Sequence, residues 1–171
     1  MNQKELNEKL IETVGNRNLP LMKYLVEQGA NIHYNNDEAL RWASNNGYLE
    51  VVKYLVEQGV DIHAADDYAL SNAVYGGHLE VLKYLVEQGA DIHARNDWAL
   101  KNASAKGHIE VIKYFLFDCK MKIKQVTKDW LLINNYKEAL QMIEKRDLLF
   151  QLDKDIIQKD SIDNFSNKIK I

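Results

Sequence analysis

The chain has 171 residues, of which 46% are apolar and 27% charged, and its formal net charge at pH 7 is −3. This length and composition are typical of one globular domain with a sizeable core. The slightly negative charge supplies no basic field that would hold a phosphate backbone, so we expect no nucleic-acid partner. No apolar run approaches the roughly 18 residues needed to cross a bilayer, so we expect no membrane partner.

The chain contains a single cysteine, Cys119. It excludes an internal disulfide and a zinc site built from several cysteines, and it agrees with a reducing compartment. The first residues, Met1-Asn2-Gln3-Lys4-Glu5, lack the positive and then apolar regions of a secretory signal. We therefore expect an intracellular, cytoplasmic protein.

Residues 1–33 are predicted to form a pair of helices. Apolar residues recur at helical spacing among charged ones over 3–14, which indicates an amphipathic helix. Asn18 is a plausible N-cap of a second helix, Pro20 falls in its first turn, and Gly29 ends it. We predict that this pair is an N-terminal cap unit, because the end of a stacked array needs a polar outer face.

A segment of seven residues, Lys-Tyr-Leu-Val-Glu-Gln-Gly, occurs three times without change, beginning at Lys23, Lys53 and Lys83. The copies are 30 residues apart, and a fixed period of this size indicates stacked supersecondary units. Ile-His follows each copy, and Asp-x-Ala-Leu comes next. The period predicts further units at 34–63, 64–93, and 94–120.

Each of these units contains an aspartate where its first helix is predicted to begin: Asp37, Asp67 and Asp97. The carboxylate of an aspartate can accept hydrogen bonds from the free amides of a first helical turn, so we expect these residues to be N-caps. In the second unit Leu40 then faces inward, and Gly47 turns the chain into a second helix.

The repeat decays toward the C-terminus. Residues 121–146 can be aligned with a divergent fifth unit, so we assign the repeat array to 1–146. Apolar residues at helical spacing after Asp147 predict a capping helix that covers the open edge of the core. We expect the polar end, 160–171, to be a flexible tail, which completes a C-terminal segment at 147–171.

The repeated unit resembles the ankyrin repeat. The segments 47–52, 77–82 and 107–112 match the G-H-x-E-V-V of that family, and Gly-Ala-Asp-Ile-His-Ala at 89–94 matches its G-A-D-V-N-A. The T-P-L-H of the family is replaced, for example by Glu-Ala-Leu-Arg at 38–41, and the period of 30 is shorter than the usual figure of about 33. The missing residues fall in the loop between units.

This resemblance implies an all-α solenoid of stacked helix-turn-helix units with shortened inter-repeat loops. The lysine- and asparagine-rich variant is similar to ankyrin proteins of giant DNA viruses of amoebae, which implies the cytoplasm of a host cell. It also implies an unidentified protein as the partner, bound through the loops and the concave side of the first helices.

The predicted partner-binding residues are positions that vary between units within a constant scaffold. They are Glu38, Arg41, Trp42, Asn45, Tyr68, Asn72, Tyr75, Trp98, Lys101 and Asn102. Exposed aromatic side chains flanked by cations suit a hot spot for protein contact. The alternative is that the aromatic side chains pack against neighbouring loops.

The recurring histidines do not favour a chemical site. Stacked units would place His33, His63 and His93 too far apart to share one metal ion, so we expect each to bond to nearby backbone. His78 and His108 precede a repeated glutamate at a helix start, which indicates capping rather than catalysis. We therefore expect no metal, no cofactor and no enzymatic activity.

Taken together, these patterns predict a monomeric, non-enzymatic protein-protein interaction module. The alternative function is a substrate-recruiting adaptor, for example for a ubiquitin ligase. In that case the divergent region over about 121–159 would dock on cellular machinery rather than only cap the array.

Overall fold

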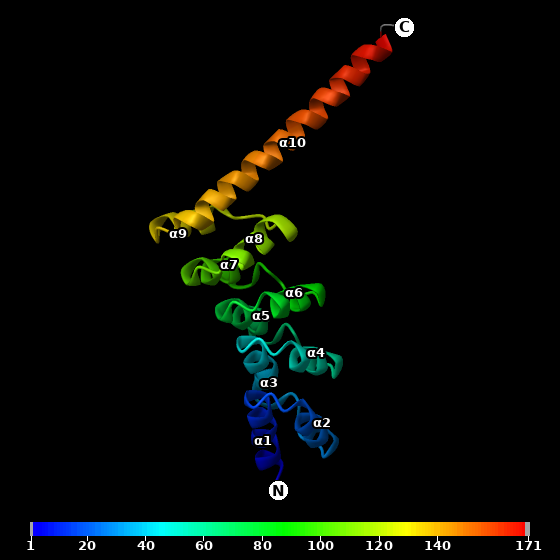
Figure 1. The fold of residues 1–171 in the computed structure, drawn as a ribbon, viewed down its shortest axis with the longest axis vertical. Helices are drawn as coiled ribbons and strands as arrows, with labels where there is room; N and C mark the ends of the chain where they lie inside the picture. The colour runs from blue at the N-terminus through cyan, green and yellow to red at the C-terminus, as the bar shows by residue number, and fades with distance from the viewer. Residues whose placement is uncertain (1, 170–171) are drawn as a thin grey trace. The chain divides into compact units, whose positions relative to one another are not determined.

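The computed structural model describes the backbone of residues 2–169 and the side chains of residues 2–159. The described backbone consists of helices and loops, without a β-strand (Figure 1). The chain divides into two compact units, Met1–Ile112 and Lys113–Ile171, and each is described by itself. The all-α architecture agrees with the fold class predicted from the sequence.

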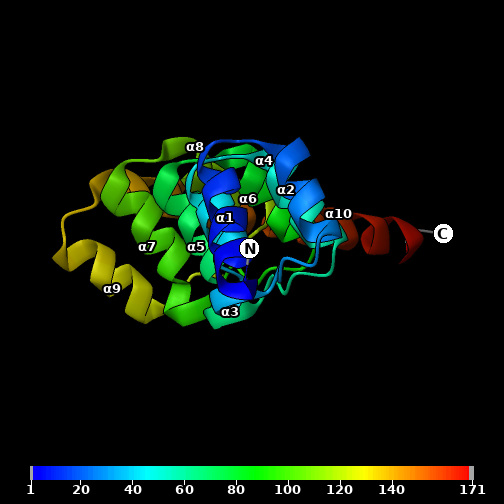
Figure 2. The same cartoon turned by 90° about the horizontal axis from the view of Figure 1, so that it is seen from below.

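The first unit is built from pairs of helices. They are α1 (Gln3–Gly15), α2 (Leu19–Glu27), α3 (Tyr34–Asn45), α4 (Leu49–Glu57), α5 (Ala64–Gly76), α6 (Leu79–Glu87), α7 (Ala94–Lys106) and α8 (Ile109–Lys113). The helices α1, α3, α5 and α7, here called the odd helices, pack side by side in one row (Figures 1 and 2). The helices α2, α4 and α6, here called the even helices, form the second row.

The core of the first unit repeats with the sequence. Leu40 on α3 and Leu55 on α4 are fully buried between the rows. The residues 30 or 60 positions away are buried too: Leu10, Leu70 and Leu100 on the odd helices, and Leu25 and Leu85 on the even ones. Burial of each leucine side chain contributes about 1.5–3 kcal/mol relative to leaving it exposed, so every added pair extends the same core.

The beginning of α3, α5 and α7 differs from the prediction. Asp37 has φ 57° and ψ 40°, and it ends a left-handed segment, Asn35–Asp37, that recurs at Ala65–Asp67 and Arg95–Asp97. The N-cap positions of these helices are occupied by His33, His63 and His93. Asp37 and Asp67 have left-handed backbone angles and bind the imidazoles of His33 and His63, so the expected N-cap position of the aspartates is wrong. Asn and Asp tolerate the left-handed region better than most residues, and they fill most of these positions.

The second unit contains a π-helical turn η1 (Tyr114–Asp118), α9 (Gln125–Ile133) and α10 (Lys137–Ile169). Both η1 and α9 pack against α10. The rings of Trp130 and Tyr136 stack with their centroids 5.3 Å apart. This contact joins α9 to the turn that precedes α10.

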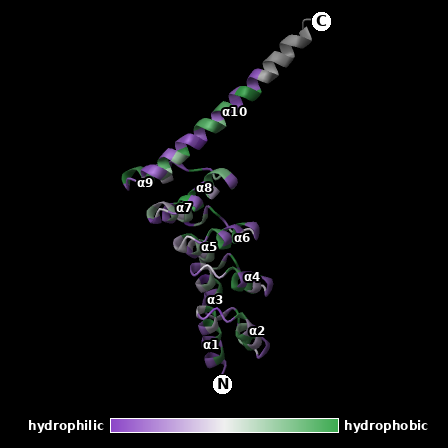
Figure 3. Ribbon diagram, viewed as in Figure 1, coloured by the Kyte–Doolittle hydropathy of each residue, from purple (hydrophilic) through white to green (hydrophobic). Residues whose placement is uncertain are grey.

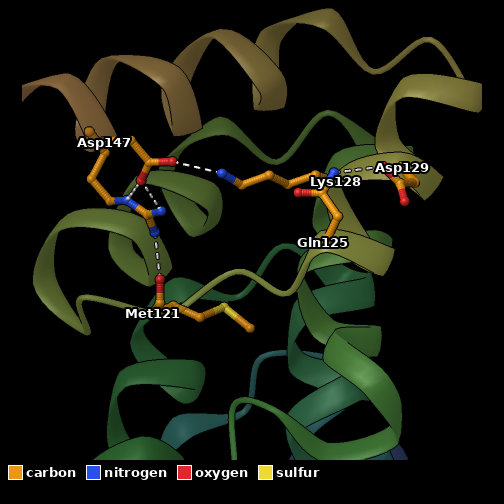
Figure 4. Close-up of polar contacts among 6 residues, drawn as sticks. Met121, Gln125, Lys128, Asp129 and Asp147 are labelled. Carbon is orange, nitrogen blue, oxygen red and sulfur yellow. Dashed lines mark hydrogen bonds and ion pairs between the residues drawn. The ribbon is translucent and has the colours of Figure 1, made fainter.

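Polar contacts fix the middle of α10 (Figure 4). Lys128 of α9 donates from Nζ to Asp147 Oδ2 at 2.8 Å, and Arg146 pairs with the other carboxylate oxygen of Asp147. The Arg146 guanidinium also donates to the backbone carbonyl of Met121. Two neighbouring residues of α10 therefore hold both α9 and the loop before it.

The C-terminal helix also differs from the prediction. The boundary expected between 146 and 147 falls inside α10, because no glycine or proline interrupts Lys137–Ile169. The side chains expected to cover the core edge are 47–66% exposed: Leu148, Leu149, Leu152, Ile156 and Ile157. A flexible tail was expected at 160–171. The backbone instead continues α10 to Ile169, and residues 170–171 lie outside the described part.

The contacts of Asp147 predict an acid-dependent loss of stability in the second unit. Burial acts to raise the pKa of Asp147, but hydrogen bonds and charge from Lys128 and Arg146 lower it below its ordinary value overall. A carboxyl group with a lowered pKa stabilises the fold above its unfolded pKa of about 4, and this stabilisation is lost as the pH falls through the folded pKa. Because the pair is partly solvated, the effect is at most about 1 kcal/mol.

Hydrogen-exchange protection of α9 should therefore fall between pH 5 and pH 2, and the Asp147→Asn variant should lack most of this pH dependence. The exposed Asp153 on the same helix provides the control substitution, Asp153→Asn. An Asp147→Asn variant with the same pH profile as the wild type would show that the ion pairs do not stabilise this unit.

Candidate functional site

Four large aromatic side chains lie exposed on successive odd helices. The exposed fractions are 46% for Trp42 on α3, 37% for Tyr68 and 51% for Tyr75 on α5, and 41% for Trp98 on α7. Neighbouring residues of the same helices, such as Ala39 and Leu40, are buried. The aromatic rings therefore occupy the side of each helix that is turned away from the core, and the neighbouring loops do not enclose them.

Cationic side chains from α7 lie against three of these rings. The guanidinium carbon of Arg95 lies 5.3 Å from the centroid of the Tyr68 ring and 5.6 Å from that of Trp98. Lys106 Nζ lies 4.0 Å from the centroid of the Tyr75 ring. Each exposed cation-π contact contributes about 0.5–1 kcal/mol. The contacts to Tyr68 and Tyr75 also join α7 to α5.

The predicted partner-binding residues did not include Arg95. A signal for Arg95 was present in the sequence, because the residues 30 and 60 positions earlier are Ala65 and Asn35. The position therefore varies between units in the way that the predicted binding positions do. We call Arg41, Trp42, Tyr68, Tyr75, Arg95, Trp98 and Lys106 together the aromatic face.

Two predicted residues hold neighbouring helices together. Arg41 is partly buried, and its Nη2 donates to the backbone carbonyl of Asn35 at 2.7 Å. Asn72 donates from Nδ2 to the backbone carbonyl of Arg41 at 3.2 Å, which links α5 to α3. Arg41 also lies 6.0 Å from the Tyr68 ring centroid. These residues position the aromatic face as well as forming part of its surface.

The remaining predicted residues border the aromatic face. Glu38 accepts a hydrogen bond from the side chain of Asn35 at 2.8 Å. Asn45 is exposed near the end of α3, and Lys101 and Asn102 are partly buried on α7. The structure thus places all ten predicted residues on three odd helices.

A histidine-aspartate pair lies at the start of each of the helices α3, α5 and α7. In each pair, an imidazole Nδ1 lies within hydrogen-bond distance of an aspartate carboxylate four residues later. The distances are 2.9 Å for His33 and Asp37, 3.0 Å for His63 and Asp67, and 2.6 Å for His93 and Asp97. The expected structural role is confirmed, but the bonding partner is a buried carboxylate rather than nearby backbone.

The first repeat, 1–33, uses uncharged residues for the same contact. Gln3 donates from Nε2 to Asn7 Oδ1 at 3.0 Å, and Asn7 lies 30 residues before Asp37. Asn7 Oδ1 also accepts from the backbone amide of Asn31 at 2.8 Å, just as Asp67 Oδ1 accepts from that of Asp91 at 3.0 Å. These side chains tie an odd helix to the loop of the following repeat.

The other two histidines, His78 and His108, each link two neighbouring repeats. His78 Nε2 donates to the carbonyl of Asn45 at 3.0 Å, and His108 Nε2 donates to that of Tyr75 at 3.1 Å. His78 is the N-cap residue of α6, and Glu80 lies in its first turn as expected, but the imidazole makes no capping hydrogen bond. Its ring packs on Gly47, where an added Cβ would lie 2.5 Å from His78 Nδ1. Within the described residues, no cluster of three His, Cys, Asp or Glu side chains could hold a metal ion.

The family model described as ankyrin repeats (many copies) matches residues 10–56, 40–86 and 70–116. These overlapping matches extend over 10–116, which is more than half of the chain. The chain belongs to the ankyrin-repeat family. No curated protein matches the sequence. Ankyrin repeats are generally protein-protein interaction modules, and none of the helices described in this ankyrin-repeat protein is long and apolar enough to span a membrane.

The contact between Gly47 and His78 predicts a stability difference between two glycine substitutions. Gly47 has φ +73° and Gly59 has φ +86°, so alanine at either position costs about 1–2 kcal/mol for the left-handed backbone. Only at Gly47 would the new Cβ also meet another residue, because nothing lies within 4 Å at Gly59. Overpacking of this kind costs roughly 1–3 kcal/mol more.

In urea unfolding followed by circular dichroism, Gly47→Ala should therefore be less stable than Gly59→Ala. In a His78→Ala background the two substitutions should cost the same, because the imidazole ring is gone. Equal costs in the wild-type background would contradict the assigned packing of His78 on Gly47.

Proposed function

We propose that this ankyrin-repeat protein is a non-enzymatic interaction module that binds a partner protein through the aromatic face. The observation that carries the proposal is the exposure of Trp42, Tyr68, Tyr75 and Trp98 on three successive odd helices, with cations beside them. Trp, Tyr and Arg are enriched among the residues that contribute most to protein binding. The proposal includes a monomeric protein that acts inside the cell.

Together with the loops before its helices, the odd-helix row suits such a partner. Packed helices lie about 8–10 Å apart, so α1 to α7 extend over roughly 25–30 Å. The regular part of α5 covers 68–76 and is about 14 Å long, because the left-handed segment Ala65–Asp67 precedes it. The row alone therefore offers about 350–420 Å², roughly half of the 800 Å² that each partner contributes to a standard complex, so the loops before these helices are expected to contribute to the contact as well.

The cation-π contacts favour binding because they order the surface before a partner arrives. Long Arg and Lys side chains lose about 0.5–1.5 kcal/mol of conformational freedom when an interface immobilises them. Arg95 and Lys106 already lie against aromatic rings in the free protein. Part of this entropic cost is therefore met by folding rather than by binding.

A second candidate function is a substrate-recruiting adaptor, for example for a ubiquitin ligase. It is favoured by the apolar residues that α10 exposes between 148 and 157, visible as green segments among purple ones in Figure 3. In this version the aromatic face holds the recruited protein, and α10 docks on the cellular machinery.

The combined substitution Trp42→Ala, Tyr75→Ala and Trp98→Ala tests the proposed function. Loss of each hot-spot side chain costs about 2 kcal/mol or more, so affinity for a partner captured from cell lysate should fall at least about 100-fold. Circular dichroism should show unchanged helix content, because the side chains are exposed. The control is Tyr24→Ala, which removes an exposed aromatic side chain from α2.

A partner retained by the triple variant at wild-type affinity would contradict the placement of the site. The adaptor version makes a further prediction for the Leu148→Ser and Ile156→Ser double variant. This variant should lose ligase components while it keeps the protein bound at the aromatic face.

A further inference from the structure

Exposed charges change sign along the row of odd helices. At one position of the repeat the residues are Glu5, Asn35, Ala65 and Arg95, each 30 residues after the last. At the next helical turn they are Glu8, Glu38, Tyr68 and Trp98. At these two positions the row has two carboxylates at α1, an amide and a carboxylate at α3, a ring at α5, and a cation and a ring at α7. The ring of α3 is Trp42, one turn further along that helix.

The acidic end includes a third carboxylate, Glu12, one turn further along α1. Two basic residues of α1 reduce this charge only in part. Lys4 pairs with Glu8 at 3.7 Å, and Lys9 occupies a position whose equivalents, Ala39 and Ala69, are buried in the core. Lys9 itself is exposed, so with two lysines and three glutamates α1 keeps a net charge of −1 (2 − 3).

The basic end consists of Arg95, Lys101 and Lys106 on α7. Aromatic rings hold Arg95 and Lys106: Arg95 lies against Tyr68 and Trp98, and Lys106 lies against Tyr75. Within the described residues, neither of these two cations forms an ion pair with a carboxylate. Their N–H groups remain available as donors, and a guanidinium binds a carboxylate through two parallel hydrogen bonds. Two exposed carboxylates lie on the neighbouring segment: Asp61 in the loop before α5, and Asp66 near the start of α5.

We propose that the partner presents an extended peptide segment of opposite polarity, with acidic residues over α7, apolar or aromatic residues over α3 and α5, and basic residues over α1. This inference rests on the proposed function, because it concerns the same face. At about 3.3 Å per residue, an extended segment of roughly eight residues covers the 25–30 Å from α1 to α7. Complementary charges at its two ends fix the direction in which it lies, because the reversed orientation places like charges together.

The test uses a random library of 12-residue peptides displayed on phage and selected on the full-length protein. Enriched peptides should carry Asp or Glu at one end, Lys or Arg at the other, and apolar or aromatic residues between them. A synthetic peptide from this set should bind more weakly as the salt concentration rises from 0.05 to 0.5 M, because exposed charge pairs are screened. Enriched peptides without charge asymmetry would overturn the inference.

Charge reversal provides the matched comparison. The Arg95→Glu and Lys106→Glu double variant should bind the selected peptide at least tenfold more weakly. Lys53→Glu and Lys83→Glu, which reverse two charges on the even helices, should leave the affinity unchanged. Equal affinities of the two double variants would overturn the inference.

The direction of the peptide is tested with a nitroxide label at its acidic end. Paramagnetic broadening should be strongest for the backbone amides of α7 and weakest for those of α1; the opposite gradient would overturn the assigned polarity.

The Trp42→Ala, Tyr75→Ala and Trp98→Ala variant separates the two proposals. Peptides that bind it as well as the wild type would refute the aromatic face itself, whereas peptides that require the rings but lack charge asymmetry would refute only the polarity.

Discussion

The close packing of the odd helices is the constraint on which the rest of the first unit depends. Small residues make it possible: Ala39, Ala43, Ala69 and Ala73 are all buried where α3 and α5 meet their neighbours. Larger side chains would push the helices apart and open the shared leucine core, which no single helix pair can bury alone. The same separation would break the cross-unit contacts of the aromatic face, since Arg95 of α7 must reach Tyr68 of α5.

Polar contacts then fix how one repeat follows the next. A buried carboxylate or amide at each 30-residue step bonds to the side chain four residues earlier, and Asn7 and Asp67 also bind the following loop. Buried polar groups without such partners would cost about 1–3 kcal/mol each, so a shifted loop is penalised. This arrangement accommodates a repeat three residues shorter than usual, because a left-handed segment such as Asn35–Asp37 turns the chain directly into the odd helix.

The 30-residue period and the resemblance to the ankyrin repeat predicted the paired helices and the inward position of Leu40. They did not predict the left-handed segments, since Asp37 has the residue type of an N-cap and only its backbone angles show otherwise. Exposure of Trp42 and Trp98 agreed with expectation, whereas Arg95 was missed because its role arises from rings on two helices. The continuity of α10 follows from the absence of glycine and proline over Lys137–Ile169, whereas the contact of Asp147 with Lys128 joins residues 19 positions apart, which helical spacing does not reveal.

The central claim is that partner proteins bind the exposed side of the odd helices. Hydrogen exchange of the protein alone and in complex with a captured partner tests it most directly, because protection reports which backbone segments binding orders. The account predicts new protection in α3, α5 and α7 and in the loops before them, with α4 and α6 unchanged. Protection confined to the even helices, or to α10, would contradict it.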